Sequence, residues 1–266
     1  MMKNKIIHQK NVQTPRSYSS GRKLLGRNET YFLEKTKIDK DFNFSHDTIE
    51  KNELQKTGKI KTKKDKQAFI FDASFADDIQ NIKRAAQLIT LKDAAVVLAE
   101  TGINSESIVF DSGSGSGGLA LFLAKHCKEV YSFDIKEEHL DVCKKNKEFL
   151  NINNVNFLNA DVTNKEDIKK HTKELKCDLF TIDILQPENA IETVREFLKI
   201  GGYLVFYTTQ LNQAKDVTDV LDNSEDFSVL SIKEVLHREW DLHNKKCKPK
   251  ETSGHTGFLL FARKVC

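Results

Sequence analysis

The clearest chemical signature is a loop rich in glycine and serine that follows a short apolar run. Residues 107–110 are Ser-Ile-Val-Phe, Asp111 comes next, and a glycine loop follows: Ser112, Gly113, Ser114, Gly115, Ser116, Gly117 and Gly118. A strand, a glycine loop and the start of a helix in this order let backbone N–H groups approach a ligand at the positive end of the helix. We therefore expect this loop to bind a nucleotide cofactor.

The spacing of the glycines fits two such cofactors. Gly113, Gly115 and Gly118 match the G-x-G-x-x-G of a dinucleotide site. Asp111 with Gly113, Gly115 and Gly117 matches the acidic-x-G-x-G-x-G loop of an S-adenosylmethionine (SAM) site. The loop alone does not decide between them.

Four aspartates, Asp111, Asp134, Asp161 and Asp183, end four consecutive apolar runs. In an open α/β sheet the ligand binds outside the carboxyl ends of the strands, so these side chains should lie near it. Asp134 follows the glycines by about twenty residues, where an acid accepts hydrogen bonds from ribose hydroxyls. Asp161, followed by Val162, is placed to meet an adenine amino group. Each aspartate alone could merely cap the next helix, but the four together indicate a cofactor site.

The elements that position these residues alternate between apolar runs and amphipathic segments. We expect strands at 107–111, 129–134, 154–158, 178–184 and 203–208, and helices at 118–126, 137–150, 165–174, 188–199 and 211–222. Gly201 and Gly202 should end the helix before the fifth strand. This order predicts a parallel sheet with helices on both faces.

Two further strand-like runs, 226–235 and 256–264, have no helix between them and should pair antiparallel. A polar loop from His237 to His255 joins them. A lone histidine is more often a hydrogen-bonding loop residue than a substrate contact, so we expect His255 to hold its loop.

The chain divides into three expected parts. Residues 1–20 are polar and should form a flexible basic arm. Residues 21–75 contain short apolar runs between polar turns, which predicts a small β module. Residues 76–266 should form the catalytic domain, and 76–100 have helical periodicity.

Positive charge is concentrated at the N-terminus. Residues 1–66 contain 17 Lys and Arg against 8 Asp and Glu, whereas the remainder contains 25 against 31. Such a segment either contacts a polyanion or is simply a solvated surface.

We see no apolar run near the roughly 20 residues of a membrane helix and no signal peptide. Five scattered cysteines without a C-x-x-C pair argue against a zinc site and a disulfide framework. We expect a cytoplasmic protein with no metal and no membrane partner.

The C-terminal hairpin favours SAM over a dinucleotide. An antiparallel strand inserted by such a hairpin is typical of SAM-dependent methyltransferases and unusual for dehydrogenases. Asp183 also has no nearby Tyr-Lys or Cys-His pair for hydride chemistry. We therefore expect an α/β fold with the seven-stranded class I methyltransferase (Rossmann-like) sheet after a small N-terminal β module. An NAD-dependent oxidoreductase is the less favoured alternative.

Several motifs resemble those of the tRNA (adenine-N1)-methyltransferase family, which methylates a T-loop adenosine. They cover residues 22 to the end and include Ile82–Arg84, Gln87–Ile89, Lys92–Ala94, Asp111–Gly118, Tyr131–Asp134, Asn212–Gln213, Glu234–Leu236, Arg238–Trp240, Gly254–Phe258 and Phe261–Lys264. The C-terminal motif is the most specific part, because generic methyltransferases have no reason to carry it.

The resemblance implies a homotetramer that binds SAM and tRNA and methylates N1 of an adenosine at position 58, or at 57 and 58. By this analogy Gln87 and the glycine loop hold SAM, Asp134 its ribose, and Asp161 with Val162 its adenine. Asp183 matches the catalytic Asp after the fourth strand, where it also borders the cofactor. A carboxylate there accepts a hydrogen bond from the adenine N6 amino group and raises the electron density at N1.

The chain departs from the family pattern after Asp183. Many members have Pro-Asp-Pro-Trp there, where this chain has Leu185-Gln186-Pro187-Glu188. Ala85 and Leu91 also replace a usual Gly and Pro. A noncatalytic RNA-binding subunit of such an enzyme is a further alternative, which the intact glycine loop and Asp183 argue against.

Overall fold

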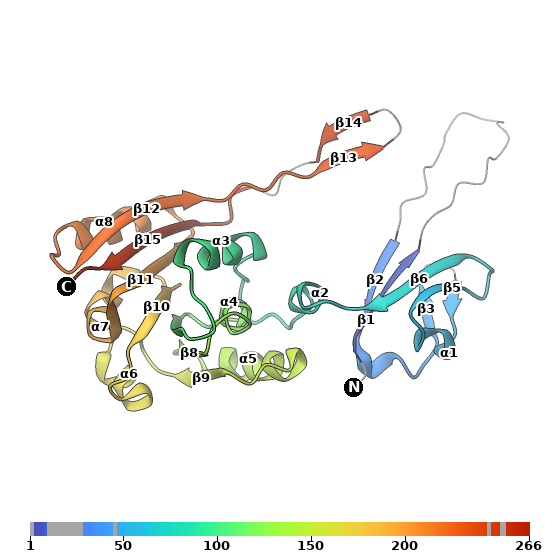
Figure 1. The fold of residues 1–266 in the computed structure, drawn as a ribbon, viewed down its shortest axis with the longest axis horizontal. Helices are drawn as coiled ribbons and strands as arrows, with labels where there is room; N and C mark the ends of the chain where they lie inside the picture. Colours follow the sequence, from blue (N-terminus) through green and yellow to red (C-terminus); the bar gives the residue numbers. More distant parts are fainter. Residues whose placement is uncertain (1–2, 10–28, 45–46, 244–245, 251–253) are drawn as a thin grey trace. The chain divides into compact units, whose positions relative to one another are not determined.

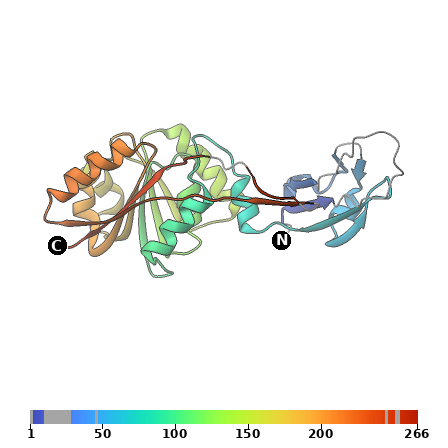
Figure 2. The same ribbon diagram turned by 90° about the horizontal axis from the view of Figure 1, so that it is seen from above.

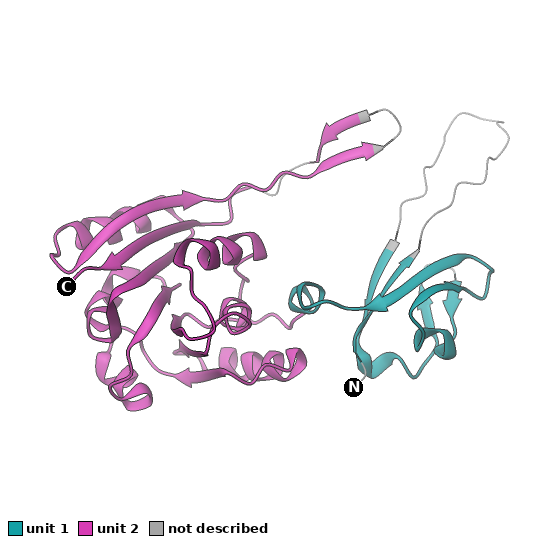
Figure 3. Ribbon diagram, viewed as in Figure 1, with its two compact units in different colours: residues 1–81 teal, residues 82–266 magenta. Residues whose placement is uncertain are grey.

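The computed structural model describes residues 3–9, 29–44, 47–243, 246–250 and 254–266. These residues form two compact units, Met1–Asn81 and Ile82–Cys266 (Figure 3). The boundary lies beyond residue 75, where the sequence placed it, so the helix α2 (Phe75–Gln80) groups with the first unit.

The first unit is a small β module. Its four-stranded sheet has the order β2-β1-β6-β5, with β1 at Lys5–Gln9, β2 at Glu29–Leu33, β5 at Gly58–Lys61 and β6 at Gln67–Asp72. A second pair joins β3 (Phe42–Phe44) to β4 (Asp47–Ile49), and two short helices, η1 (Lys35–Lys37) and α1 (Lys51–Leu54), complete the unit. Its core is apolar and includes Ile7, Leu33, Ile49, Leu54 and Ile70.

The first strand corrects one expectation. A flexible arm over residues 1–20 is wrong for Lys5–Gln9, which pair antiparallel with both β2 and β6. Ile6 and Ile7 are buried there, and their burial against strands far along the chain outweighs the polar local composition. Residues 10–20 lie outside the described residues.

The second unit contains the seven-stranded sheet that the sequence predicts. Its order is β12-β15-β11-β10-β7-β8-β9, and β15 runs antiparallel to β11 and β12 while the other described pairs are parallel. The strands are β7 (Ile108–Ser112), β8 (Glu129–Asp134), β9 (Val155–Asn159), β10 (Cys177–Ile182), β11 (Leu198–Thr208), β12 (Phe227–Glu234) and β15 (Phe258–Lys264).

Helices cover both faces of this sheet (Figures 1 and 2). One face carries α3 (Leu91–Thr101), α4 (Gly118–Leu123) and α5 (Glu137–Leu150). The other carries α6 (Lys165–Thr172), α7 (Ile191–Phe197), which follows the short helix η2 (Pro187–Ala190), and α8 (Leu211–Asp222). Among the described residues no helix is long and apolar enough to cross a membrane.

Three local expectations differ from the structure. Residues 81–90 are not helical and separate α2 from α3. Gly201 does not cap a helix, because α7 ends in the extended Leu198 and both Gly201 and Gly202 lie inside β11. The expected loop from His237 to His255 contains a two-stranded hairpin, β13 (Trp240–His243) with β14 (Lys246–Pro249).

The core of the second unit is centred on aromatic side chains beneath the strands. Phe110 is fully buried and its ring lies 5.5–5.6 Å from those of Tyr131, Phe133 and Phe180. Such centroid distances favour edge-to-face contacts. This packing fixes the strands whose carboxyl ends carry the candidate site.

We expect truncation inside this core to be costly and truncation outside it to be mild. Leu204 of β11 is fully buried, whereas Leu230 of β12 is half-exposed. Leu204→Ala should lower the free energy of unfolding by about 2–5 kcal/mol, because it loses apolar burial and leaves a cavity. Leu230→Ala, the same truncation in the same sheet, should cost less than about 1 kcal/mol. Urea denaturation measures both, and equal losses would contradict the assigned core.

Candidate active site

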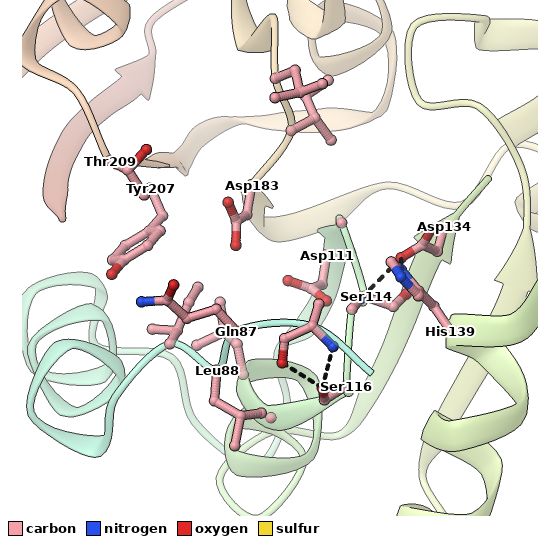
Figure 4. A pocket seen from close by; sticks show the side chains of 18 of the residues that line it. Gln87, Leu88, Asp111, Ser114, Ser116, Asp134, His139, Asp183, Tyr207 and Thr209 are labelled. Atoms are coloured by element: carbon pink, nitrogen blue, oxygen red, sulfur yellow. Dashed lines mark hydrogen bonds and ion pairs between the residues drawn. The ribbon is translucent and has the colours of Figure 1, made fainter. Parts of the chain in front are cut away.

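A cavity of about 430 Å³ lies at the carboxyl ends of the central strands. It is entirely within the second unit. Many of the residues singled out from sequence line it, namely Gln87, Gly113, Ser114, Gly115, Ser116, Gly118, Asp134 and Asp183 (Figure 4). The strand order therefore brings together side chains that lie almost a hundred residues apart in the chain.

Four other expected residues do not line this cavity. Ser112 and Gly117 are part of the glycine loop, but their positions serve packing. The Ser112 carbonyl accepts a hydrogen bond from the Asp183 N–H at 2.8 Å. Asp161 and Val162 follow β9, where Asp161 Oδ1 accepts bonds from the Thr163 N–H and hydroxyl at 2.9 and 2.7 Å. Val162 is buried in the core.

The glycine loop packs tightly against the end of β10. A Cβ atom on Gly113 would overlap the backbone oxygen of Asp183, and Gly113 has a φ of +86°. Both features require glycine at this position. The Gly113 and Ser114 N–H groups donate to the Phe133 carbonyl at 2.9 and 3.2 Å, which ties the loop to β8 as well.

The carboxylate of Asp134 is fixed by three neighbours. Its Oδ2 accepts from the Gly115 N–H at 2.9 Å and lies 3.0 Å from His139 Nδ1, while its Oδ1 accepts from the Lys136 N–H at 2.9 Å. Asp134 is nearly buried. These bonds hold an acceptor carboxylate in one orientation at the cavity wall.

Asp111 is a buried support beneath the glycine loop. The hydroxyls of Ser132 and Thr181 each donate to its carboxyl at 2.6 Å. Burial raises its pKa, and the two hydroxyl bonds oppose that shift. Its neighbours on β8 and β10 thereby connect the loop to the two strands beside it.

Asp183 differs from the other two carboxyls of the site because its side chain has no hydrogen-bond partner among the described residues. Among the described residues, none forms a hydrogen bond with its side chain, which points into the cavity (Figure 4). Burial raises its pKa to about 7, and the negative charges of Asp111 and Asp134 add to the shift. Near neutral pH this group exchanges a proton readily and is free to accept a hydrogen bond from a ligand.

Ser116 explains why residues 81–90 are not helical. Its hydroxyl accepts from the Ala85 and Ala86 N–H groups at 2.9 and 3.0 Å and lies 2.9 Å from the Ala86 carbonyl. The Asn146 amide donates to the carbonyls of Lys83 and Ser116, both at 2.8 Å. The backbone bonds of this segment are thus satisfied from outside it, and Gln87 is held at the cavity.

Sequence reasoning assigned no role at the site to several lining residues. His139 lies in the first turn of α5, five residues after Asp134, and Tyr207, Thr208 and Thr209 lie at the carboxyl end of β11 or directly after it. The carboxyl end of the fifth strand was the available signal, because ligands in such sheets bind at strand ends. These residues lack the acidic side chain that marked the carboxyl ends of the first four expected strands.

The arrangement suits a ligand that combines ribose hydroxyls with positive charge. Asp134 presents fixed acceptor oxygens, and Asp111, Asp134 and Asp183 make the cavity electronegative. Such a cluster of buried like charges is costly unless a cation lies between them. Gly113 and Gly115 line the same cavity beside them.

Comparison with known proteins places the chain among methyltransferases. A family model described as a methyltransferase domain matches residues 103–247. The tRNA (adenine(57)-N(1)/adenine(58)-N(1))-methyltransferase TrmI of Methanocaldococcus jannaschii is 24% identical over 89% of this chain and 92% of its own.

Two solved structures share the fold over nearly the whole chain. A SAM-dependent O-methyltransferase from Thermotoga maritima has a TM-score of 0.82 at 21% identity, covering 99% of this chain and 93% of its own. The tRNA (m1A58) methyltransferase TrmI from Aquifex aeolicus has a TM-score of 0.79 at 20% identity, covering 99% and 97%.

The contact between Gly113 and Asp183 leads to a stability prediction. Gly113→Ala should lower the free energy of unfolding by more than about 3 kcal/mol, because it adds backbone strain and an overlap that only strand movement relieves. Gly102→Ala is the matched control, since Gly102 also has a positive φ but open space around its Cβ position. It should cost about 1 kcal/mol. Thermal unfolding measures both, and similar losses would contradict the close approach.

The raised pKa of Asp183 leads to a prediction about pH. Its pKa is about 7 in the folded protein against 3.8 ordinarily, so the folded state binds the proton more tightly. The cost of ionising Asp183 is absent below about pH 4 and grows as pH rises toward 7. At pH 8 the free energy of unfolding of Asp183→Asn should therefore exceed that of the native protein, by at most about 4 kcal/mol, which thermal unfolding measures as a higher Tm. The gain should vanish at pH 4, and a difference independent of pH would refute the shift.

Proposed function

The chain belongs to the methyltransferase domain family, and we propose that it transfers a methyl group from SAM to N1 of an adenosine in tRNA. The observation that carries the reaction is the free carboxyl of Asp183, which lines the cavity next to the glycine loop. The choice of substrate is supported by the similarity to the M. jannaschii tRNA methyltransferase over 92% of that protein.

The cavity fits SAM. When bound, SAM supplies an electrophilic methyl group on a positively charged sulfur. The backbone of residues 113–116 lines the cavity, and Asp134 offers oxygens for ribose hydroxyls. We place Gln87 and the rest of the loop, Ser112 to Gly118, around the cofactor. Asp161 would meet its adenine, since only Oδ1 of Asp161 accepts hydrogen bonds from the described residues. Val162, whose side chain is buried in the core, would do so only as the neighbour of Asp161 in the chain.

Asp183 would prepare the acceptor base. Its ionised carboxyl accepts a hydrogen bond from the adenine N6 amino group, which raises the electron density at N1. The same negative charge stabilises the cation that methylation of N1 creates. The remaining work is alignment of N1 with the methyl group, which the rigid strand ends provide.

The N-terminal unit supplies positive charge for RNA. The exposed strand β5 carries Lys59 and Lys61 on one face, and Lys63, Lys64 and Lys66 follow in the turn to β6. Of these, Lys61 and Lys63 have acidic partners. Such a surface contacts phosphates without reading bases, and the target base must still leave its stack to enter the cavity.

We extend the proposal to assembly and location. The hairpin β13–β14 exposes Trp240 and Leu242, which are 55% and 69% accessible. Exposed apolar side chains of this size often mark protein interfaces, which supports a homotetramer. A tRNA substrate is consistent with a cytoplasmic enzyme.

The noncatalytic subunit and the NAD-dependent oxidoreductase are not favoured, because the cofactor loop and Asp183 are both in place.

The test combines unmodified tRNA transcripts, SAM and the purified protein, with mass spectrometry of the digested nucleosides. We expect 1-methyladenosine, mapped to the T-loop. Asp183→Asn should reduce kcat at least about 100-fold, because it removes a charge that acts on the transition state.

Two controls make this test specific. SAM affinity of Asp183→Asn, measured by calorimetry, should fall far less than kcat, by less than about 10-fold, because the carboxyl acts mainly on the acceptor base and only weakly on the donor. Asp167→Asn, on the surface of α6 and ion-paired to Lys170, should leave kcat unchanged. A methyl group on another atom, or full activity of Asp183→Asn, would reject the proposal.

A further inference from the structure

His255 links three segments at the rim of the cavity. Its Nε2 lies 2.9 Å from the Thr209 carbonyl, and its Nδ1 lies 2.7 Å from Glu234 Oε1 at the end of β12. Its ring also contacts that of Phe258 at 4.5 Å. Thr209 lines the cavity, so the histidine reaches the site through a backbone carbonyl rather than by touching a ligand.

The next residue anchors the histidine from the other side. Thr256 Oγ1 donates to the buried Asp93 at 2.9 Å and accepts from Lys92 Nζ at 2.6 Å. Lys92 also donates to Asp93 and to the Val235 carbonyl, both at 2.7 Å. The start of α3, the end of β12 and the chain before β15 are thereby joined in one network.

Tyr207 connects this network to the cavity wall. Its hydroxyl donates to the Thr256 carbonyl at 2.7 Å, and burial raises its pKa to about 12, so it stays a donor. Gly257 has no side chain, and a Cβ there would overlap the Tyr207 ring. The ring therefore lies directly on the backbone of residues 256–257 and borders the cavity opposite Asp183 (Figure 4).

We propose that His255 is a positioning residue whose charged ring, held by Glu234, fixes the rim Tyr207–Thr209 against the acceptor base. We call the contacts of His255 with Glu234 and with the Thr209 carbonyl the clamp. That the clamp serves an acceptor base rests on the proposed function, whereas the existence of the clamp does not. Residues 254–258 thus serve the reaction without touching either substrate.

The charge of His255 follows from its partners. Both ring nitrogens face oxygen acceptors, so both must carry protons to donate. Glu234 and the Thr209 carbonyl raise the pKa of His255, and the nearby Lys92 opposes them. The clamp is complete below this pKa and loses one bond as pH rises through it. Asp183 has the opposite requirement, because it must be ionised to act.

Two substitutions test the clamp. His255→Gln keeps a neutral donor for Thr209 but does not titrate, and Glu234→Gln removes the carboxylate that holds the charged ring. In the native enzyme we expect kcat to fall at high pH as His255 loses its proton. His255→Gln should lower kcat about 3- to 30-fold and abolish that fall, with KM for SAM within 2-fold. Glu234→Gln should move the fall to lower pH. His126→Gln is the control, since His126 is exposed after α4 and contacts Phe122.

A second readout does not depend on activity. Amide hydrogen exchange of residues 207–212 should be faster in His255→Gln than in the native protein, and unchanged in His126→Gln. Absence of any tRNA methylation by the native protein would reject the proposed function, and exchange would still decide the clamp. Unchanged exchange, or an unchanged pH profile of kcat in both variants of the clamp, overturns the inference.

Discussion

The close approach of the glycine loop to the end of β10 is the constraint on which the site depends. β7 and β10 are neighbours at the centre of the parallel sheet, so Asp111 and Asp183 leave adjacent strands at the same edge. The Asp183 N–H continues the pairing by donating to the Ser112 carbonyl. Only a residue without a side chain fits at Gly113. Sheet register, rather than loop sequence alone, thus sets where the free carboxyl lies.

That register also concentrates negative charge. The structure stabilises Asp111 with two hydroxyls and Asp134 with two backbone N–H groups, but it leaves Asp183 without a partner among the described residues. A partly buried carboxyl without a hydrogen-bond partner is costly, and such costs are concentrated at functional sites. The contrast between the two satisfied aspartates and the free one distinguishes a support from a group that meets a ligand.

Sequence periodicity predicted the elements that carry their own signals. The helices α5 and α8 have the expected bounds, because each has an apolar stripe and α5 ends at Asn151 in the left-handed conformation. The strand β8 also has the bounds expected from the sequence, Glu129–Asp134. Residues 81–90 were misassigned because their conformation depends on Ser116 and Asn146, which lie 30 or more residues away. Long-range bonds of this kind leave no local pattern.

The same reasoning explains which site residues the sequence revealed. Aspartates that end apolar runs are conspicuous, so Asp111, Asp134 and Asp183 were found. The rim formed by Tyr207 and Thr209 was not, since a tyrosine or threonine at a strand end is ordinary in a β-strand. Their place becomes evident only once β15 pairs beside β11 and brings Thr256 onto Tyr207. His255 was expected to hold its loop, and the structure adds which carbonyl it holds.

The electrostatics of the cavity give the reaction an order. Without a cation, burial first and the charges of Asp111 and Asp134 second raise the pKa of Asp183 to about 7 and keep it partly protonated near neutral pH, and a protonated carboxyl is a poor acceptor for an amino group. A positively charged ligand between these carboxyls lowers the pKa of Asp183, because an opposite charge favours the ionised form. Binding of the donor and readiness of the acceptor site are then coupled, and by linkage each strengthens the other. An electronegative cavity with one unpaired aspartate is therefore suited to a cationic methyl donor that binds before the base.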